Sequence, residues 1–349
     1  MSSDKTVSSN GAEGYNVFGI SSSIAATLIL ISPILFTLIA YPDTFILSWN
    51  EGRGGFLFAM AFIAAELVGL KYSLTKKRLF MVAVMAALTI SYFIALPYGL
   101  SDYIRNGKDV YNVSLVDSWM WLWDFVVMAV FVASSLVLLF GKKWYKIASA
   151  GAIYLAGSAL ILALDAFFPF DSLGPLQIVV PIYLQIDQAI INFVDTSIIN
   201  VGPQRSNSSA EPALATGNLL VMNGLHGPFA LQVFWPSAGV HSMIIYTLVM
   251  LAMLIKMDMP LTRKLIYFAA GTLGTVATNL VRIVSLSLYA LVVTTDVQEW
   301  EAFHSIAGEI MFLPWLGIYL GVVIYIENKR IRRLQAGLTG GGASNPSTL

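Results

Sequence analysis

The chain of 349 residues is 57% hydrophobic and only 11% charged, with 20 basic and 20 acidic residues. Soluble domains carry about 25% charged residues, so this composition excludes a soluble globular protein and predicts an all-α polytopic membrane protein. The absence of cysteine excludes disulfides, thiolate metal sites and a cysteine nucleophile, and there are only three histidines. We therefore predict no metal, no cofactor and no nucleic-acid partner.

The chain opens with a Ser- and Gly-rich stretch, residues 1–20, which lacks a basic region followed by a cleavage site and is predicted to be a disordered cytoplasmic tail. A helix needs about 20 apolar residues to cross the hydrocarbon of a bilayer. Runs that approach this length predict about eight transmembrane helices, at 21–40, 54–71, 79–97, 119–140, 147–168, 238–256, 264–293 and 305–326.

Lysine and arginine gather in alternate gaps between these runs, near residues 71–78, 142–146, 256–264 and 329–333. The other gaps are mixed or acidic. Because basic loops stay on the cytoplasmic side, this pattern predicts a multi-pass protein of the plasma membrane with both termini inside. Residues 169–236 then begin and end outside the cell, so they cannot contain a single extra crossing.

Within this outer segment, residues 181–199 carry apolar side chains at helical spacing and predict an amphipathic helix on the outer surface. A pair of short re-entrant pieces is the alternative. Residues 203–217 have the composition of a loop. Two short apolar runs, 218–224 and 229–235, predict a β-hairpin that ends directly on the Pro236–Ser237 step. The apolar positions of the helix are Ile182, Ile186, Ile190, Phe193 and Val194.

The predicted organisation has five parts. A cytoplasmic tail (1–20) precedes a five-helix membrane part (21–168). An extracytoplasmic cap (169–236) leads to a three-helix core (237–326) that contains Ser237, Arg282 and His304. The chain closes with a basic and then disordered cytoplasmic tail (327–349).

Helix rise places several polar residues at a common height. Counted from charged residues at the inner ends of their helices, Ser237, Arg282 and His304 rise about 28, 27 and 34 Å. The same count gives about 27 Å for Asp124 and about 28 Å for Asp165. These five residues can therefore meet in one layer near the outer face.

Ser237 follows a proline at the start of a predicted helix. One interpretation is an ordinary N-cap. The other is a nucleophile at a helix N-terminus, where the helix dipole favours developing negative charge. A serine hydroxyl needs a base to remove its proton. His304, at the start of the last span, and His241, one turn after Ser237, are the two candidate bases.

Arg282 lies inside a long apolar run, and a guanidinium in a span usually faces a partner or a wet cavity. Asn279 lies one turn earlier on the same helix face. The intramembrane acids Asp124 and Asp165 are candidates to pair with Arg282, to orient a histidine or to help hold a substrate; a purely structural ion pair is the alternative. The polar residues gather in the outer half and the chain has no internal repeat, which argues against a transporter.

Three short motifs follow one another at the outer ends of the last three spans. Together they resemble the exosortase/archaeosortase family of polytopic membrane transpeptidases over roughly residues 218–326. Serine stands where that family has its catalytic cysteine, as we expect for the thaumarchaeal branch, the thaumarchaeosortases, and histidine stands where the first motif usually has arginine. The matching motifs are Ser237-Ala-Gly-Val-His241-Ser242, Asn279-Leu-Val-Arg282 and His304-Ser-Ile-Ala-Gly308.

The resemblance implies an enzyme that recognises secreted proteins by a C-terminal tail made of a short motif, a transmembrane helix and a basic cluster. It implies cleavage at the motif and transfer of the new C-terminus to an acceptor, expected to be a lipid. Ser237 is the implied nucleophile, His304 the base, and Arg282 the group that stabilises the oxyanion or holds the substrate. A serine ester is less activated than a thioester, so a non-catalytic binder of sorting tails is the alternative.

Overall fold

The computed structural model describes residues 16–17, 20–46, 52–68, 70, 72, 74–168, 178–194 and 214–340. Within these residues, seven helices are long and apolar enough to cross a membrane, which confirms the all-α polytopic class. The predicted terminal tails lie largely outside the described residues, as does most of the predicted loop at 203–217.

The chain divides into two compact units. Unit 1 comprises Met1–Pro169 and Leu251–Met257, and unit 2 comprises Phe170–Met250 and Asp258–Leu349. The first segment of unit 1 ends beside the predicted boundary at residue 168. The predicted cap from Phe170 and the predicted three-helix core fall together in unit 2, except for Leu251–Met257, which belong to unit 1. The candidate residues from Ser237 onward therefore belong to one unit.

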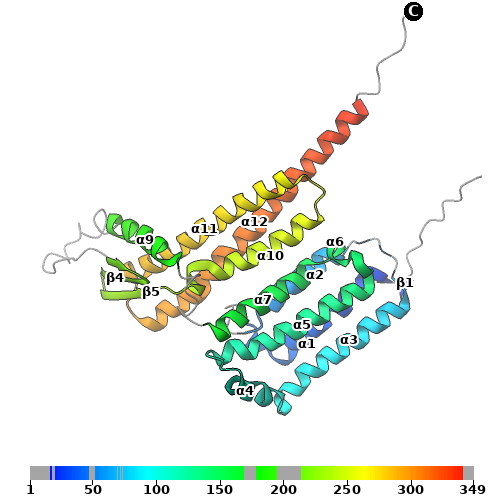
Figure 1. The fold of residues 1–349 in the computed structure, drawn as a ribbon, viewed down its shortest axis with the longest axis horizontal. Helices are drawn as coiled ribbons and strands as arrows, with labels where there is room; N and C mark the ends of the chain where they lie inside the picture. The colour runs from blue at the N-terminus through cyan, green and yellow to red at the C-terminus, as the bar shows by residue number, and fades with distance from the viewer. Residues whose placement is uncertain are drawn as a thin grey trace, which may run out of the picture. The chain divides into compact units, whose positions relative to one another are not determined.

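Unit 1 is a bundle of apolar helices with short outer elements (Figure 1). Its long helices pack against one another through buried Leu, Ile, Val and Phe side chains, which is what a bilayer-length apolar sequence favours. The helices are α1 (Ser22–Ala40), α2 (Gly55–Leu67), α3 (Lys76–Ala95), α4 (Leu100–Val110), α5 (Val116–Phe140), α6 (Trp144–Ile147) and α7 (Ala150–Phe167). The shorter elements are β1 (Asn16–Val17), β2 (Ile20–Ser21), η1 (Pro42–Thr44), η2 (Leu96–Tyr98) and η3 (Gly141–Lys143).

Helix α2 is shorter than the span predicted at 54–71. It has 13 residues, which corresponds to roughly 20 Å of rise, whereas the hydrocarbon core is about 30 Å thick. Apolar composition alone does not show where a helix ends. Seven of the expected eight spans therefore have full-length helices among the described residues, and the eighth is a short helix packed against α1 and α7.

A buried ion pair joins the start of α2 to α5. Arg53 donates from Nε and Nη2 to Oδ2 of Asp124, both at 2.8 Å, and the Tyr92 hydroxyl donates to Oδ1 at 2.9 Å. Both carboxylate oxygens of Asp124 are thus occupied within unit 1. Asp124 therefore has a structural role within unit 1. In the sequence, the available indication of its partner was Arg53, which lies in a gap predicted to be on the outer side.

We expect Asp124→Asn to destabilise the protein by about 3–5 kcal/mol, because the buried Arg53 guanidinium loses its counter-charge. The measurement is the fraction of monomer that survives heating in detergent, followed by size exclusion. Asp109→Asn, which alters an exposed carboxylate on α4, is the matched control and should change stability by less than about 0.5 kcal/mol. Equal effects of the two variants would contradict a structural role for the ion pair.

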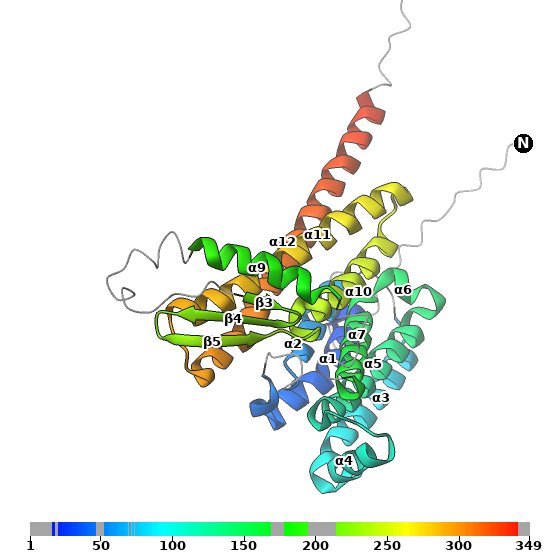
Figure 2. The same cartoon turned by 60° about the vertical axis from the view of Figure 1, so that its left-hand side comes forward.

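Unit 2 combines three long helices with a small sheet and a surface helix (Figure 2). Helices α11 and α12 pack side by side as a hairpin, and α9 lies along α11. The elements are α9 (Val180–Val194), β3 (Leu214–Thr216), β4 (Leu219–Gly224), β5 (Gly227–Gln232), the π-helical turn η6 (Pro236–Val240), α10 (His241–Lys256), α11 (Leu261–Val292) and α12 (Val297–Gly340). The last turns of α10 belong to unit 1.

The predicted β-hairpin is present. Strands β4 and β5 pair antiparallel from Leu219↔Gln232 to Gly224↔Gly227, and the turn consists of Leu225 and His226. A third strand, β3, pairs with β4 across a turn at Gly217, which has a φ of 63°. The sequence did not predict β3. The hairpin leads within four residues into the turn that carries Ser237, so the sheet fixes the entry to that turn.

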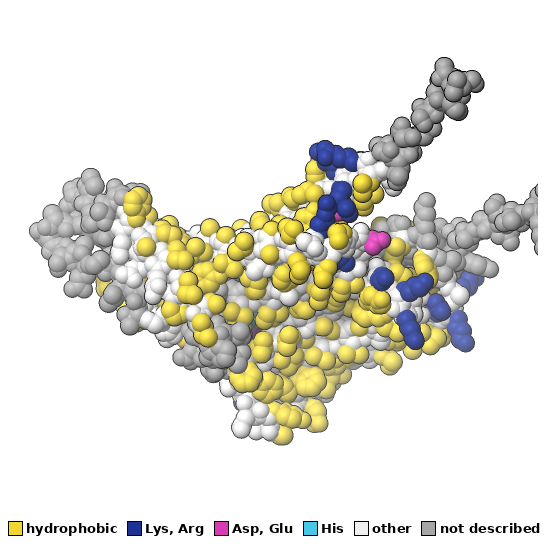
Figure 3. Space-filling model, turned by 45° about the horizontal axis from the view of Figure 1, so that its top comes forward, with side chains coloured by type: hydrophobic (Ala, Val, Ile, Leu, Met, Phe, Trp, Pro, Cys, Tyr) yellow, Lys and Arg dark blue, Asp and Glu magenta, His cyan; other side chains and the backbone are white. Residues whose placement is uncertain are grey.

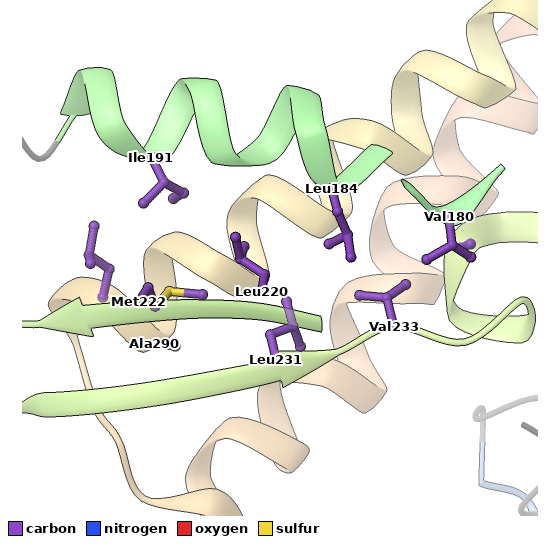
Figure 4. Close-up of a cluster of buried hydrophobic side chains, with 10 residues drawn as sticks. Val180, Leu184, Ile191, Leu220, Met222, Leu231, Val233 and Ala290 are labelled. Carbon is purple, nitrogen blue, oxygen red and sulfur yellow. The ribbon is translucent and has the colours of Figure 1, made fainter. Parts of the chain in front are cut away.

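Helix α9 forms as predicted but buries a different face. The buried residues are Val180, Leu184, Asp187 and Ile191. Of these, Val180, Leu184 and Ile191 pack over β4 and β5 (Figure 4). The apolar positions taken from the sequence, represented by Ile182, Ile186 and Phe193, are exposed instead. Helix α9 is apolar on two faces, so periodicity alone could not choose between them.

Hydrophobic side chains cover much of the visible surface of the molecule (Figure 3). On α12, lysine and arginine side chains gather close to the start of the undescribed C-terminal segment (Figure 3). Arg332 and Arg333 are exposed there, while Arg330 and Arg263 contact the buried Glu327. A wide apolar surface that ends in a basic cluster is what a helix that crosses a membrane is expected to show.

Candidate functional site

Ser237 lies in an irregular turn rather than at a simple helix start. Residues Pro236–Val240 form a π-helical turn, and the regular helix begins at His241. Gly239 has φ 90° and ψ 13°, a left-handed conformation that favours glycine. Trp235 is fully buried before the turn, whereas Ser237 is partly exposed. The backbone at Ser237 is therefore held by the buried Trp235 before it and by the constrained Gly239 after it, while the Ser237 side chain stays partly exposed.

Asn279 of α11 holds this turn from the side. Its Nδ2 donates a hydrogen bond to the carbonyl oxygen of Ala238, the residue after Ser237. A Cβ atom on Gly239 would lie 2.2 Å from Cγ of Asn279, so only glycine leaves room for the amide. Asn279 is buried, and its second contact is with the side chain of Tyr183 on α9. The amide thus links the Ser237 turn, α11 and α9.

Arg282, one turn after Asn279, contacts His304 on α12. The distance from Nη2 of Arg282 to Nε2 of His304 is 3.3 Å. A guanidinium only donates hydrogen bonds, so this contact requires an unprotonated Nε2 and places the ring proton on Nδ1. Gly308, one turn after His304, leaves room for the guanidinium. A Cβ atom at this position would lie 3.0 Å from Cζ of Arg282, which is closer than an ordinary contact.

Trp300 fixes the ring plane of His304. The two rings stack with centroids 5.2 Å apart and planes inclined by 21°. The indole Nε1 of Trp300 donates to the carbonyl oxygen of Leu286 on α11 at 3.2 Å. His304 is therefore oriented by a stacked ring on one side and by Arg282 at Nε2, which is the kind of support that a positioned base requires.

A small recess lies beside Arg282 and Asn279. It has a volume of about 10 Å³, which is room for about one water molecule. Ser242, Thr275 and Thr278 line it together with Asn279 and Arg282, and Met311 and Phe312 of α12 add an apolar side. The predicted site residues of α11 therefore border a small recess with both polar and apolar walls.

The predicted site residues fall into two groups. Ser237, Asn279, Arg282, His304 and His241 all lie in unit 2, where Asn279 and Arg282 connect the serine turn to His304. His241 is buried edge-on against Trp235, with ring centroids 5.2 Å apart. Among the described residues, the side-chain contacts of the His304 ring are with Arg282 and Trp300, and none of them is with Ser237.

Asp124 and Asp165 lie in unit 1. Asp124 is engaged by Arg53, and Asp165 is buried near the end of α7. Sequence reasoning missed Trp300, Tyr183 and the hydroxyl groups of the recess. For Trp300 a signal was available, because it precedes His304 by one helical turn. No local pattern connects Tyr183 to Asn279, since they come from elements 96 positions apart in the chain.

Within the described part of the chain, no group of three or more His, Cys, Asp or Glu side chains is placed to hold a metal ion. Comparison with protein-family models, with curated proteins and with solved structures finds no match for this chain. The function is therefore argued from the geometry of the site and from the motif resemblance.

Proposed function

We propose that this protein is a membrane-bound sorting protease and transpeptidase that uses Ser237 as its nucleophile. The observation that carries the proposal is the connected set formed by Asn279, Arg282 and His304 beside the Ser237 turn. It supplies the types of group that acyl transfer needs: a hydroxyl, an imidazole with an unprotonated nitrogen, and a cationic donor.

In the proposed reaction, Oγ of Ser237 attacks the scissile carbonyl while its proton passes to His304. The tetrahedral oxyanion is stabilised by the guanidinium of Arg282. Collapse of the intermediate breaks the C–N bond, and His304 returns the proton to the leaving amine. The acyl-serine ester is then attacked by a nucleophile of the acceptor, which His304 deprotonates in its turn, so that Ser237 is regenerated.

The contact between Arg282 and His304 adds a condition to this scheme. Nε2 of His304 accepts a hydrogen bond from Arg282, so its lone pair is engaged by the guanidinium and not by Ser237. We propose that a substrate carbonyl draws the guanidinium away and so releases Nε2. The base then becomes active only when a peptide occupies the site, which limits wasteful reactions of the nucleophile.

The proposed substrates are secreted proteins with a C-terminal tail composed of a short motif, a transmembrane helix and a basic cluster, and the proposed acceptor is a lipid. The proposed location is the outer face of the plasma membrane. The alternation of basic gaps supports this orientation, including the cluster at the end of α12.

A second candidate function is the binding of sorting tails without cleavage. It is favoured by the contact of His304 with Arg282, because among the described residues this candidate base contacts Arg282 rather than Ser237. The two candidates differ in one outcome, because only the enzyme changes the covalent structure of its partner.

The test is co-expression with a secreted reporter that carries such a tail, taken from proteins encoded in the same genome, and with a reporter that lacks the transmembrane helix of the tail. We expect the first reporter to lose its tail and the second to remain intact, as read by intact-mass spectrometry. A reporter that co-purifies with the protein but keeps its full mass would establish the binder. A reporter that neither binds nor changes would exclude both candidates.

A further inference from the structure

Helix α9 carries a carboxylic acid in the middle of its buried apolar face. Val180, Leu184, Asp187 and Ile191 follow one another at helical spacing, and all four are buried. The three apolar residues of this face pack into one cluster with Leu220 and Leu231 of the sheet and with the end of α11 (Figure 4). Asp187 is 0% exposed, so its carboxyl group lies where the helix otherwise places leucine and isoleucine.

The described residues give Asp187 one hydrogen-bond partner. Oγ of Ser287 on α11 donates to Oδ2 of Asp187 at 2.5 Å. Oδ1 has no partner within the described part of the chain. Burying an ionised carboxylate with a single donor is costly, whereas a neutral carboxylic acid is tolerated at much lower cost. The contact between α9 and α11 therefore favours the protonated acid.

Within the part of the chain that the structure describes, no charged group near Asp187 offsets this cost. The elements packed against α9 are α11, β3 and β4. Strands β3 and β4 contain no ionisable side chain. On α11, Arg282 and Tyr289 contact His304 and Phe303 of α12, and on α9 the ionisable neighbour is Tyr183. Burial raises the pKa of Asp187 to about 6, and the Ser287 hydrogen bond opposes this rise.

The same face of α9 reaches the candidate site. Tyr183, one turn before Asp187, contacts Asn279, which holds the carbonyl group of Ala238 in the serine turn. Asn279 and Ser287 lie eight residues apart on one buried face of α11, so α9 contacts both ends of a two-turn stretch. An α9 that leaves α11 would remove the support of Asn279.

We propose that Tyr183 and Asp187 are positioning residues of the candidate site. Asp187 fixes α9 on α11 when its carboxyl group is neutral, so low pH stabilises the contact between Tyr183 and Asn279. The docking of α9 follows from the fold alone. The effect of docking on catalysis rests on the proposed function.

The direction of the pH dependence follows from proton linkage. The docked carboxyl binds its proton more tightly than the undocked one, whose pKa is the ordinary value near 4. Docking is therefore strongest below about pH 4, weakens as the pH rises, and has lost this contribution above about pH 6. A pKa difference of about two corresponds to a change of about 100-fold in the docking equilibrium constant.

The experiment is hydrogen exchange of the intact detergent-solubilised protein, read on peptides that cover α9. Corrected for the intrinsic pH dependence of exchange, protection of α9 should fall by up to about 100-fold between about pH 4 and about pH 7. Asp187→Asn should keep protection high and constant. Glu299→Gln, at an exposed carboxylate on α12, should behave as the wild type.

Ser287→Ala provides a second variant. It removes the donor that favours the charged carboxylate, so the midpoint of the transition should move to higher pH. Protection that does not change with pH in the wild type would overturn the proposal. A pH dependence that Asp187→Asn and Ser287→Ala both leave unchanged would also overturn it.

Tyr183→Phe separates docking from positioning. It removes the hydroxyl that contacts Asn279 and keeps the apolar packing, so α9 protection should remain while reporter processing falls about 5- to 10-fold. Processing equal to that of the wild type would exclude the positioning role of Tyr183. If no processing occurs in any variant, the proposed function fails, and the exchange experiment still decides whether α9 docking depends on Asp187.

Discussion

Replacing Ser237 with alanine is expected to abolish processing of the reporter, with a loss of about 10⁴-fold or more, because an enzyme without its nucleophile keeps only the catalysis due to binding and charge. The same variant should lose labelling by a fluorophosphonate, a reagent that reacts with activated serine hydroxyl groups. Tandem mass spectrometry of the wild type should place the label on the peptide that contains Ser237. Abundance and monomer fraction should match the wild type, because Ser237 is only partly buried.

Ser285→Ala is the matched control. Its hydroxyl donates to the carbonyl oxygen of Val281 in the same helix at 2.7 Å, so its loss should leave processing and labelling unchanged. If Ser237→Ala processes the reporter at the wild-type rate, the nucleophile assignment is wrong, whatever the fate of the other residues.

The absence of cysteine makes Ser237→Cys a direct probe of the site, because the variant contains a single thiol. A thiol is intrinsically a strong nucleophile, so we expect this variant to retain or increase processing. Its inhibition by iodoacetamide, and the insensitivity of Ser285→Cys to the same reagent, would show that the reaction passes through position 237.

Arg282→Lys is expected to reduce processing by about 10²- to 10³-fold although it keeps the positive charge. A lysine ammonium is a point charge and cannot reproduce the planar fork that contacts His304 while reaching an oxyanion. Protein abundance and reporter co-purification should persist, so that the loss appears in turnover. The measurement is the initial rate of tail removal from the purified reporter in proteoliposomes.

Arg330→Lys is the control for this substitution. Arg330 pairs with Glu327 at the opposite end of α12, where Nε and Oε2 are 2.8 Å apart. About 22 residues of helix separate it from Gly308, which corresponds to roughly 33 Å of rise. Processing should therefore be unchanged in Arg330→Lys. A similar loss in both variants would mean that Arg282 acts through general stability.

The Arg282–His304 contact also predicts that substitutions of the two residues have coupled effects on activity. If the two residues act as a unit, Arg282→Lys combined with His304→Gln should lose less activity than the product of the single losses. Independent contributions would instead multiply, and would show that the contact between Arg282 and His304 has no part in the reaction.

Helices α11 and α9 of unit 2 show which features could be predicted from the sequence and which could not. Helix α11 was placed from its apolar run, and the height of Arg282 followed from helix rise, because both quantities are local. Helix α9 was also placed, but its buried face was not. Leu184 and Ile191 pack inward while Ile186 and Phe193 remain exposed, and two apolar faces give no preferred rotation.

What the sequence by itself determined is the class of the protein, the positions of seven full-length apolar helices, the hairpin before Ser237 and the order of the motifs. These features depend on length, apolar composition and turn residues, which are encoded within short windows of the chain. The short helix α2 shows the boundary of this information, because hydrophobicity does not reveal where helical hydrogen bonding stops.

Only the tertiary structure decided which polar groups meet. It paired Asp124 with Arg53, Asn279 with the carbonyl group of Ala238, Arg282 with His304, and Asp187 with Ser287. Helix rise gave expected heights for Asp124, Arg282 and His304, but not the direction in which each helix faces. That rotation is set by the packing of small and large side chains between helices, which depends on the whole fold and is not encoded in any one segment.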